Sequence, residues 1–470
     1  MNYIQLILFS LPLALVAFIF EIYPRLANRK FGVDVWTHLL YLKEYHKQKG
    51  IPKKIENGFL VPGEYDYPPA FIFILSLFPF RIVKKYEFAF SPFFDVLHLI
   101  IIFLISYSLT ENLLIALLTQ ALYILTPIIV LENSSATPRS LGYTLFTIFL
   151  FSLFLFTQTG MYYLLAIAVF SSTIILLSHR FTSQSVLFFS VFFSIIEKNI
   201  IYIEAFAISF FLAIIVSKGF YLKVLRGHLG NLSFWYKNIN YRFSHQVKGN
   251  YRQHKTGDFI FKLYNQFLKF PPFMLTITNP WTLPSLYMFL FSNPANPILQ
   301  KMVWWVVFSY ILATVTTWVP KLRFLGEGQR YLELSAFPAA LLSSIFFVDM
   351  MNTNLSNIVA GYYVLVGIAS FLTIIIIQRK GIIKDKLRTV TPDMEEMFSY
   401  LKNLKNKPKL LCIPHQITTN TIYHTGCPVF VNASYWTINL ISDVYPYLRK
   451  NARDILKEKN LDAILLNEDY

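Results

Sequence analysis

The sequence is poor in charge and in cysteine. Only 14% of its 470 residues are Asp, Glu, Lys or Arg, and 55% are hydrophobic, whereas soluble domains carry about 25% charged residues. This composition excludes an ordinary soluble domain. The two cysteines, Cys412 and Cys427, permit at most one disulfide and form no metal-binding cluster.

Several catalytic and cofactor-binding motifs are also missing. The chain has no serine-hydrolase elbow, no HExxH and no Rossmann fingerprint, and the glycine-bracketed turn at 326–330 lacks the Gly-Lys-Ser/Thr ending of a P-loop. We therefore expect no nucleotide cofactor. The net charge of +16 is not arranged as a basic patch with interleaved aromatics, so we expect no nucleic-acid partner. Such a charge suits anionic lipid headgroups or phosphorylated substrates.

What the sequence does have is long apolar runs of the length that crosses a bilayer as a helix. The first run lacks a basic n-region and a small-residue cleavage site, so it is expected to be a retained span. The predicted fold class is an all-α polytopic membrane protein with about 11 transmembrane helices. The expected spans cover residues 3–22, 92–109, 112–131, 141–157, 160–178, 184–198, 200–217, 272–291, 301–319, 331–349 and 357–377.

Three segments interrupt this membrane pattern. They are a polar loop at 31–69, a basic stretch at 218–270 and the tail after Arg379. We expect residues 1–379 to form a transmembrane domain with a catalytic first loop, and residues 380–470 to form a small α/β domain. In the tail, strand-length apolar runs and one helix are expected; they are Lys409–Pro414, Pro428–Asn432, Ala463–Leu466 and the helix Asp443–Lys459.

The run 68–80 decides the topology. It is apolar but only about a dozen residues long, opens with two prolines and contains Pro79, whereas a crossing needs about twenty residues. We interpret it as a juxtamembrane or re-entrant helix. Counting it as a span gives twelve crossings, and the basic clusters then obey the positive-inside rule better. Both topologies are open at the level of sequence.

Asp34 follows the first span, and His38 comes four residues later, on the same face of a helix. An acidic residue at a membrane surface can act as a general base or bind a cation. The alternative is a helix N-cap, since Asp commonly precedes helices. Asp66 lies between two tyrosines and just before Pro68-Pro69, which would hold it in place. Its alternative is a solvated acidic turn.

Three further places carry polar residues at the ends of expected spans. Glu132 and Arg139 share one short turn, where they can pair with each other, complete a metal site or grip a phosphate. His179 ends the fifth span and is either an interfacial anchor or a ligand for zinc or manganese. Arg330, followed by Tyr331, is either a clamp for a lipid-linked phosphate or a snorkelling side chain.

With these motifs in this order, the chain resembles the GT-C superfamily of polytopic glycosyltransferases. This superfamily includes oligosaccharyltransferase catalytic subunits, protein O-mannosyltransferases and lipid A aminoarabinose transferases. Asp34 is similar to the family's first-loop acidic residue, and Asp66-Tyr-Pro-Pro69 to its acidic-x-Pro-Pro element. Glu132 stands where the family keeps a second acidic residue, and Arg330-Tyr331 before Pro338 resembles the start of a late span. The resemblance covers residues 1 to about 350 in layout.

The resemblance implies a sugar transfer from a polyprenyl-phosphate-linked donor to a protein, lipid or glycan acceptor. Asp34 would be the general base, while Arg330 and Arg139, with His38 and Tyr331, would bind the substrate. A divalent metal (Mg²⁺, Mn²⁺ or Zn²⁺) would be held by the acidic and histidine residues Asp66, Glu132 and His179. Membrane lipids are the expected surroundings, in the cell membrane, with the active site and the C-terminal domain facing outside. The oligomeric state is left open.

Two other functions remain open from the sequence. A transporter or flippase for a lipid-linked or anionic solute would place the functional weight on Asp95 and Glu204, the acidic residues within expected spans. A polysaccharide polymerase or ligase is chemically close to the transferase but also takes a lipid-linked acceptor.

Overall fold

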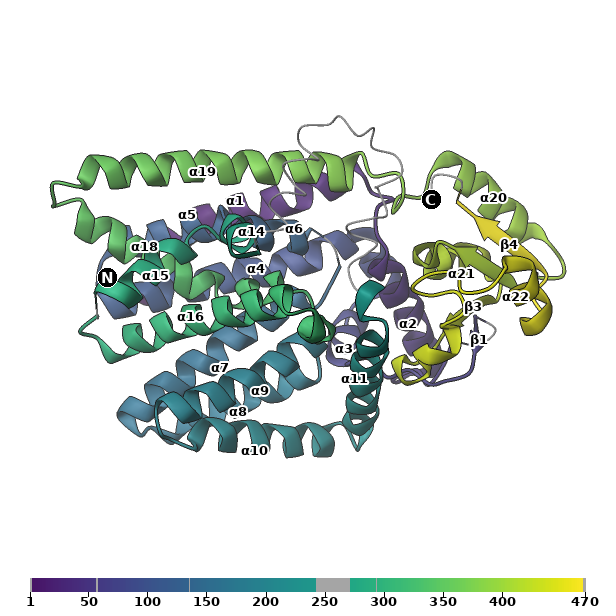
Figure 1. Ribbon diagram of the computed structural model, residues 1–470, viewed down its shortest axis with the longest axis horizontal. Helices are drawn as coiled ribbons and strands as arrows, with labels where there is room; N and C mark the ends of the chain where they lie inside the picture. The colour runs from purple at the N-terminus through teal and green to yellow at the C-terminus, as the bar shows by residue number, and fades with distance from the viewer. Residues whose placement is uncertain (1, 56–57, 135, 242–270, 293, 468–470) are drawn as a thin grey trace.

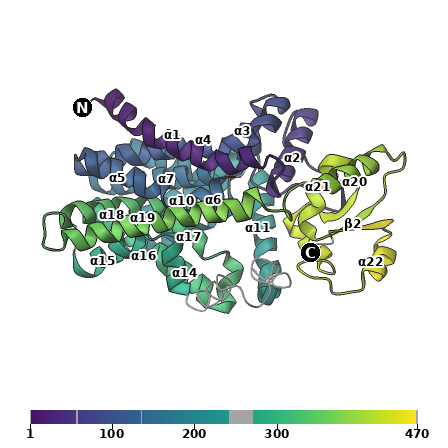
Figure 2. The ribbon, with the colours of Figure 1, turned by 90° about the horizontal axis from the view of Figure 1, so that it is seen from above.

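The computed structural model describes residues 2–55, 58–134, 136–241, 271–292 and 294–467. A bundle of helices forms the larger part, and a smaller part with a β-sheet lies at one end of it (Figures 1 and 2). Helices α2 and α11 lie between the two (Figure 1). The basic stretch expected at 218–270 is described only up to residue 241, so its remainder lies outside the described residues.

Five helices in the described ranges are long and apolar enough to cross a membrane, or up to seven if each of two bent pairs is one span. The expected count of eleven is therefore not confirmed. The long helices are α1 (Tyr3–Ala27), α4 (Phe80–Thr110), α7 (Arg139–Thr159), α16 (Pro297–Trp318) and α19 (Ser356–Gln378). The bent pairs are α5 (Leu113–Ile124) with α6 (Pro127–Asn133), and α10 (Ile201–Val216) with α11 (Phe220–Lys237).

The two breaks have local causes. The first, of 61°, falls at Pro127, whose missing N–H suits the first position of a new helix. The second, of 117°, falls before Gly219, whose φ of +82° is a left-handed conformation that glycine adopts without strain. The second bend lets α11 run across the end of the bundle instead of continuing along it (Figure 1).

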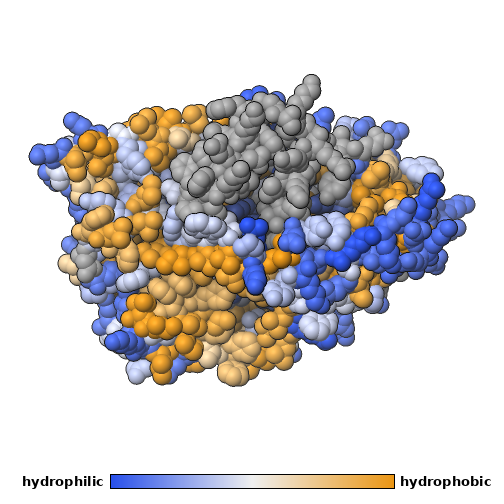
Figure 3. Space-filling model, in the orientation of Figure 1, coloured by the Kyte–Doolittle hydropathy of each residue, from blue (hydrophilic) through white to orange (hydrophobic). Residues whose placement is uncertain are grey.

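Shorter helices complete the bundle. Four of them are apolar but only 10–17 residues long, namely α8 (Tyr162–Leu176), α9 (Arg180–Ile196), α15 (Thr282–Phe291) and α18 (Ala336–Met350). Short helices connect them, namely α14 (Pro271–Thr278), α17 (Gln329–Leu334), η1 (Ile239–Tyr241), η2 (Pro320–Leu325) and η3 (Arg379–Ile383). Apolar side chains gather over the helical part in Figure 3, while the part with the sheet is mainly hydrophilic.

The first loop is folded. It contains α2 (Asp34–Gln48), β1 (Phe59–Val61) and α3 (Ala70–Ser76), and α4 then begins at Phe80. The run 68–80 thus gives a helix of seven residues, which at 1.5 Å per residue is about 10 Å long. It is too short to cross a bilayer of about 30 Å.

The sheet unites the first loop with the tail. Its strands run parallel in the order β1-β3-β2-β4. The tail elements are α20 (Pro392–Asn403), β2 (Leu410–Ile413), η4 (His415–Ile417), α21 (Thr418–Thr425), β3 (Val429–Asn432), η5 (Tyr435–Ile441), α22 (Ala452–Lys459) and β4 (Ala463–Leu466). β1, from the first loop, is the edge strand beside β3.

One element of the tail begins later than expected. The helix predicted over Asp443–Lys459 starts only at Ala452, where the side chain of Asn451 caps it. Pro446 lies near the start of the predicted range and cannot donate a backbone hydrogen bond. The strands lie within the three apolar runs, and Cys412 and Cys427 are both buried free thiols.

Candidate active site

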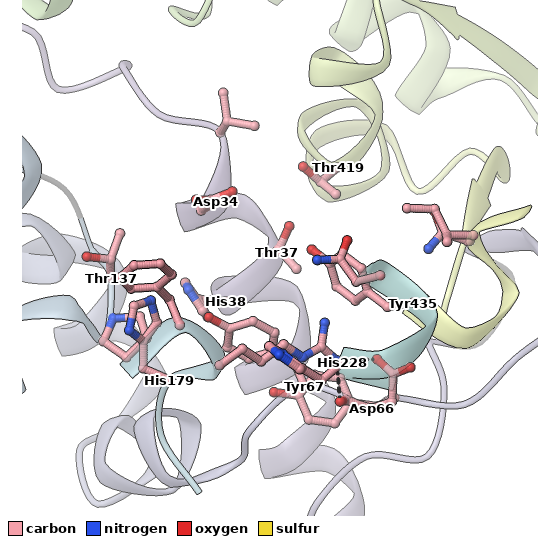
Figure 4. A pocket seen from close by; sticks show the side chains of 18 of the residues that line it. Asp34, Thr37, His38, Asp66, Tyr67, Thr137, His179, His228, Thr419 and Tyr435 are labelled. Carbon is pink, nitrogen blue, oxygen red and sulfur yellow. Dashed lines mark hydrogen bonds and ion pairs between the residues drawn. The ribbon is translucent and has the colours of Figure 1, made fainter. Parts of the chain in front are cut away.

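A pocket of about 520 Å³ lies where the end of the bundle meets the sheet. The bundle contributes the starts of α7, α9 and α17, the first loop contributes α2, and the sheet contributes the chain that follows β2 and β3. Figure 4 shows the labelled side chains around it: Asp34, Thr37 and His38 along α2, Thr137 and His179 on one side, and Thr419 and Tyr435 on the other. Residues far apart in the sequence therefore share one cavity.

Asp34 is the first residue of α2 and an exposed side chain of this pocket. The helix is capped by Val33 without a side-chain hydrogen bond, so Asp34 is not the N-cap. Its carboxylate has no hydrogen bond or ion pair within the described residues. His38, one turn later, is buried. Burial lowers its pKa, and the opposing effect of the Asp34 charge is smaller, so the net shift is downward. The His38 imidazole is therefore neutral near pH 7 and lies one helical turn from Asp34.

Two arginines line the pocket opposite these groups. Arg139, the first residue of α7, is ion-paired with Glu132 and lies 3.7 Å from the Glu333 carboxylate. The Nε of Arg330 donates to a Glu327 oxygen at 3.0 Å. The carboxylates hold the guanidinium groups in place, and a planar guanidinium suits bidentate contact with a phosphate.

His179 and Tyr331, two further residues predicted for the site, differ in whether they line the pocket. His179 lines the pocket, and its Nδ1 lies 2.8 Å from Thr182 Oγ1. Burial, together with the charges of Arg139 and Arg330, holds the pKa of His179 well below its usual range. Tyr331 is fully buried; its ring packs 4.8 Å from that of Phe181, and its hydroxyl accepts a hydrogen bond from a glutamine side chain. It contacts protein on all sides rather than the cavity.

Asp66 is engaged by neighbouring protein groups. Its Oδ1 accepts from Arg180 Nη2 at 2.8 Å, and its Oδ2 accepts from Ser434 Oγ at 2.5 Å and from the backbone N–H of Trp436 at 3.1 Å. Both side chains of the Asp66–Arg180 ion pair are less than 10% exposed. Asp66 is therefore not the solvated acidic turn that the sequence left open.

The residues expected to ligate a metal do not fit such a role in this arrangement. Asp66 is bound to Arg180, Glu132 to Arg139, and His179 lies beside Thr182. In the ranges that the structure describes, no group of three or more His, Cys, Asp or Glu side chains is placed to hold a metal ion. The three side chains that were expected to bind a metal ion are thus already engaged in hydrogen bonds or ion pairs with other protein groups.

Sequence reasoning missed several pocket residues. Arg180 adjoins the predicted His179, and His228 lies on α11 within the basic stretch. Others follow strands β2 and β3, such as Thr419 and Asn432. The rule that ligands bind at the carboxyl ends of parallel strands was the available signal, but the sequence did not show that this edge meets the first loop.

Comparison with known proteins gives the fold. No family model matches the sequence, and no curated protein matches it. Among solved structures, the oligosaccharyltransferase of Archaeoglobus fulgidus superposes with a TM-score of 0.56 at 12% identity over 90% of this chain. ArnT from Cupriavidus metallidurans superposes with a TM-score of 0.53 at 10% identity over 97% of this chain. The chain has the fold of these membrane glycosyltransferases.

The share of each solved glycosyltransferase that this chain covers differs. The chain spans 64% of the archaeal oligosaccharyltransferase but 92% of ArnT. The archaeal enzyme has been solved with Zn and sulfate, and with an inhibitory peptide and a dolichol-phosphate. ArnT has been solved bound to undecaprenyl phosphate. These ligands were bound to the two solved enzymes.

Proposed function

We propose that the protein is a membrane glycosyltransferase that moves a sugar from a polyprenyl-phosphate-linked donor to an acceptor hydroxyl or amide. The observation that carries the proposal is that the unpaired carboxylate of Asp34 shares one pocket with Arg139 and Arg330. The two solved enzymes compared above have each been seen with a polyprenyl phosphate. The pocket also lies at the end of the helical part, whose surface is largely apolar (Figure 3), so a lipid headgroup would reach it.

The arginines would hold the donor. Arg139 and Arg330 are held by ion pairs with carboxylates, and both residues line the cavity. In the reaction, the bond from the anomeric carbon to the phosphate oxygen breaks, and the electron pair goes to the phosphate. Fixed cations stabilise the charge that develops there, an effect worth on the order of 3 kcal/mol per donor group.

Asp34 would act on the acceptor. As the acceptor oxygen or nitrogen attacks the anomeric carbon with inversion, its proton passes to the Asp34 carboxylate. The wall that follows β2 and β3 offers neutral hydrogen-bonding groups, among them Gln416, Thr419 and Asn432. A polar neutral wall suits an uncharged acceptor group placed between Asp34 and the donor.

A transporter receives less support. Asp95 accepts a hydrogen bond from Tyr123 at 2.8 Å, and both nitrogens of His98 lie within 3.0 Å of hydroxyl groups. Glu204 is exposed on the surface of α10. Asp95 is thus hydrogen-bonded within the bundle, and Glu204 is not among the residues that line the pocket.

The test is a lipid extract from cells that lack the protein. A glycosyltransferase of this kind predicts accumulation of one lipid-linked sugar, and loss of that sugar from its acceptor, both reversed by the wild-type chain. An unchanged lipid-linked pool would contradict the proposal. The side of the membrane can be read in the same cells from a cysteine introduced at the exposed Lys450, because Cys412 and Cys427 are buried. We expect labelling from outside.

A further inference from the structure

Asp66 is the centre of a closed set of contacts. Besides the ion pair through Oδ1, its backbone carbonyl accepts a second hydrogen bond from Arg180 Nη2 at 2.5 Å. Ser434 and the Trp436 amide occupy Oδ2. A divalent cation could bind this carboxylate only by displacing one of these donors.

The contacts join parts of the chain that are remote in sequence. Asp66 belongs to the first loop, Arg180 begins α9 in the bundle, and Ser434 with Trp436 belongs to the tail. The guanidinium group of Arg180 lies 4.2 Å from the centroid of the Tyr435 ring, also in the tail. Loop, bundle and tail are therefore held at one point.

Helix α11 packs against the same group of contacts. A Cβ atom at Gly227 would overlap the Asp66 carboxylate and would lie 2.8 Å from Arg180 Nη2. At Gly230, one turn further, a Cβ would lie 2.9 Å from backbone atoms of Tyr435 and Trp436. The backbone of α11 thus packs directly on the ion pair and on the tail segment that it holds.

The charge at this point also opposes a metal ion. Arg180 places a fixed positive charge on the carboxylate, at the distance of a hydrogen bond. A divalent cation beside Asp66 would be repelled by this guanidinium group, since like charges at a few ångströms in a low-dielectric site disfavour each other strongly. The pair already neutralises the buried carboxylate without a metal.

We propose that Asp66 is a latch that docks the C-terminal part onto the bundle through Arg180, Ser434 and the Trp436 amide, and that this role removes it from any metal site. Asp66 is thus a positioning residue. It acts on the pocket by fixing the tail, which supplies Tyr435 and the segments after β2 and β3.

Hydrogen exchange on the purified full-length chain tests the latch. Asp66→Asn removes the carboxylate charge that pairs with Arg180, which keeps only the backbone carbonyl of residue 66 as acceptor, and the amide cannot accept from the tail donors and from Arg180 at both positions. Amides in the segment 434–441 should therefore exchange at least about tenfold faster. Glu64→Gln is the matched control, because Glu64 lies two residues away and pairs with Lys223 on the surface. Ser434→Ala should give a smaller increase and serves if Asp66→Asn does not fold. Exchange as slow as in the Glu64 control would overturn the latch.

Metal titration tests the claim that Asp66 belongs to no metal site. Chelator-treated wild-type protein titrated with Mn²⁺ or Zn²⁺ should show no saturable site that depends on Asp66, so Asp66→Asn should give the same binding curve. One metal ion bound per chain and lost in Asp66→Asn would overturn the proposal. Neither measurement uses sugar transfer, so failure of the latch is distinguishable from failure of the proposed enzyme activity.

Discussion

At the scale of the residue, the charged groups of the pocket differ in whether they have a protein partner. Asp66, Arg139, Arg180 and Arg330 are all ion-paired. Asp34 has no such partner in the described part of the chain, although it is exposed to the cavity. A free carboxylate can take up a proton without breaking a protein contact, which is what a general base requires.

Replacing Asp34 by Asn should therefore abolish transfer while leaving the fold and donor binding intact. The amide is nearly isosteric but cannot accept the acceptor proton, and the loss expected for a general base is about 10²- to 10⁴-fold. Transfer by purified protein to its acceptor measures the effect. Glu44→Gln, on the same helix and bonded only to Gln48 in the described residues, is the control. Full activity in Asp34→Asn would remove this residue from the mechanism.

Replacing Arg330 by Ala should weaken binding of a polyprenyl phosphate. Truncating one partner of a buried charge contact costs about 2 to 3 kcal/mol, or roughly 30- to 150-fold in Kd. Binding of undecaprenyl phosphate in detergent measures the effect. Arg323→Ala is the control, because Arg323 donates to the Thr317 carbonyl and is not among the residues of the cavity wall. Equal losses in the two variants would mean that only overall charge matters.

At the scale of the element, α11 is the helix on which the site is packed. It crosses the end of the bundle (Figure 1) and presents glycine to the Asp66–Arg180 pair. Hydropathy alone could not reveal this, because the sequence around Gly227 reads only as a basic interruption of the membrane pattern. Its role depends on the bend before Gly219.

Gly227→Ala should destabilise the protein by about 1 to 3 kcal/mol, the usual cost of overpacking. The added methyl group meets a buried ion pair that has no room to move. The matched control is Gly361→Ala in α19, where nothing lies within 4 Å of the new atom; a small stabilisation is expected there. Thermal unfolding in detergent compares the two. Similar midpoints for both variants would contradict the packing described for α11.

Several elements could be predicted from sequence because their causes are local. The short helix after Pro69 and the strand-length runs in the tail follow from proline placement and apolar length. The break at Pro127 has an equally local cause but was not predicted, because residues 112–131 were expected to form one span. The late start of α22 shows the limit, because a residue that opposes helix, Pro446, was included in the predicted range. The number of spans also failed to follow from hydropathy, since several apolar runs form helices shorter than 18 residues.

At the scale of the whole molecule, the sequence could place the polar residues at the ends of helices but not their partners. Asp34, Arg139 and Arg330 do share a cavity, as expected from their positions after or before apolar runs. Arg180 and the tail residues could not be found in this way. Their contacts join segments hundreds of residues apart, and no local pattern encodes such pairings.

The part with the sheet should lose stability in acid. Burial, together with the charges of Lys84 and Lys402 and against that of Glu395, lowers the pKa of His424 to about 4. The unfolded histidine titrates near 6.5. Between these values the unfolded chain binds a proton that the folded chain does not, so stability is lost as the pH falls from about 6.5 towards 4.

Unfolding midpoints at pH 7 and pH 4.5 measure this loss. His424→Phe should reduce it, since a phenyl ring can keep the stacking with Phe398, whose ring centroid lies 5.3 Å away. His46→Asn, at an exposed histidine, is the control and should leave the acid sensitivity unchanged. An equal acid sensitivity in wild-type and His424→Phe would contradict this assignment.

The edge strand β1 has a consequence for how the molecule is made. It comes from the first loop and finds its neighbour β3 only in the tail, and the nearby Asp66 and Ser434 are 368 positions apart. During synthesis, β1 therefore stays unpaired until the intervening helices have been inserted and β3 has been made. A chain cut short before β3 would leave that strand open to foreign partners, so a ribosome stalled late on this message should yield a product that aggregates rather than one that is merely inactive.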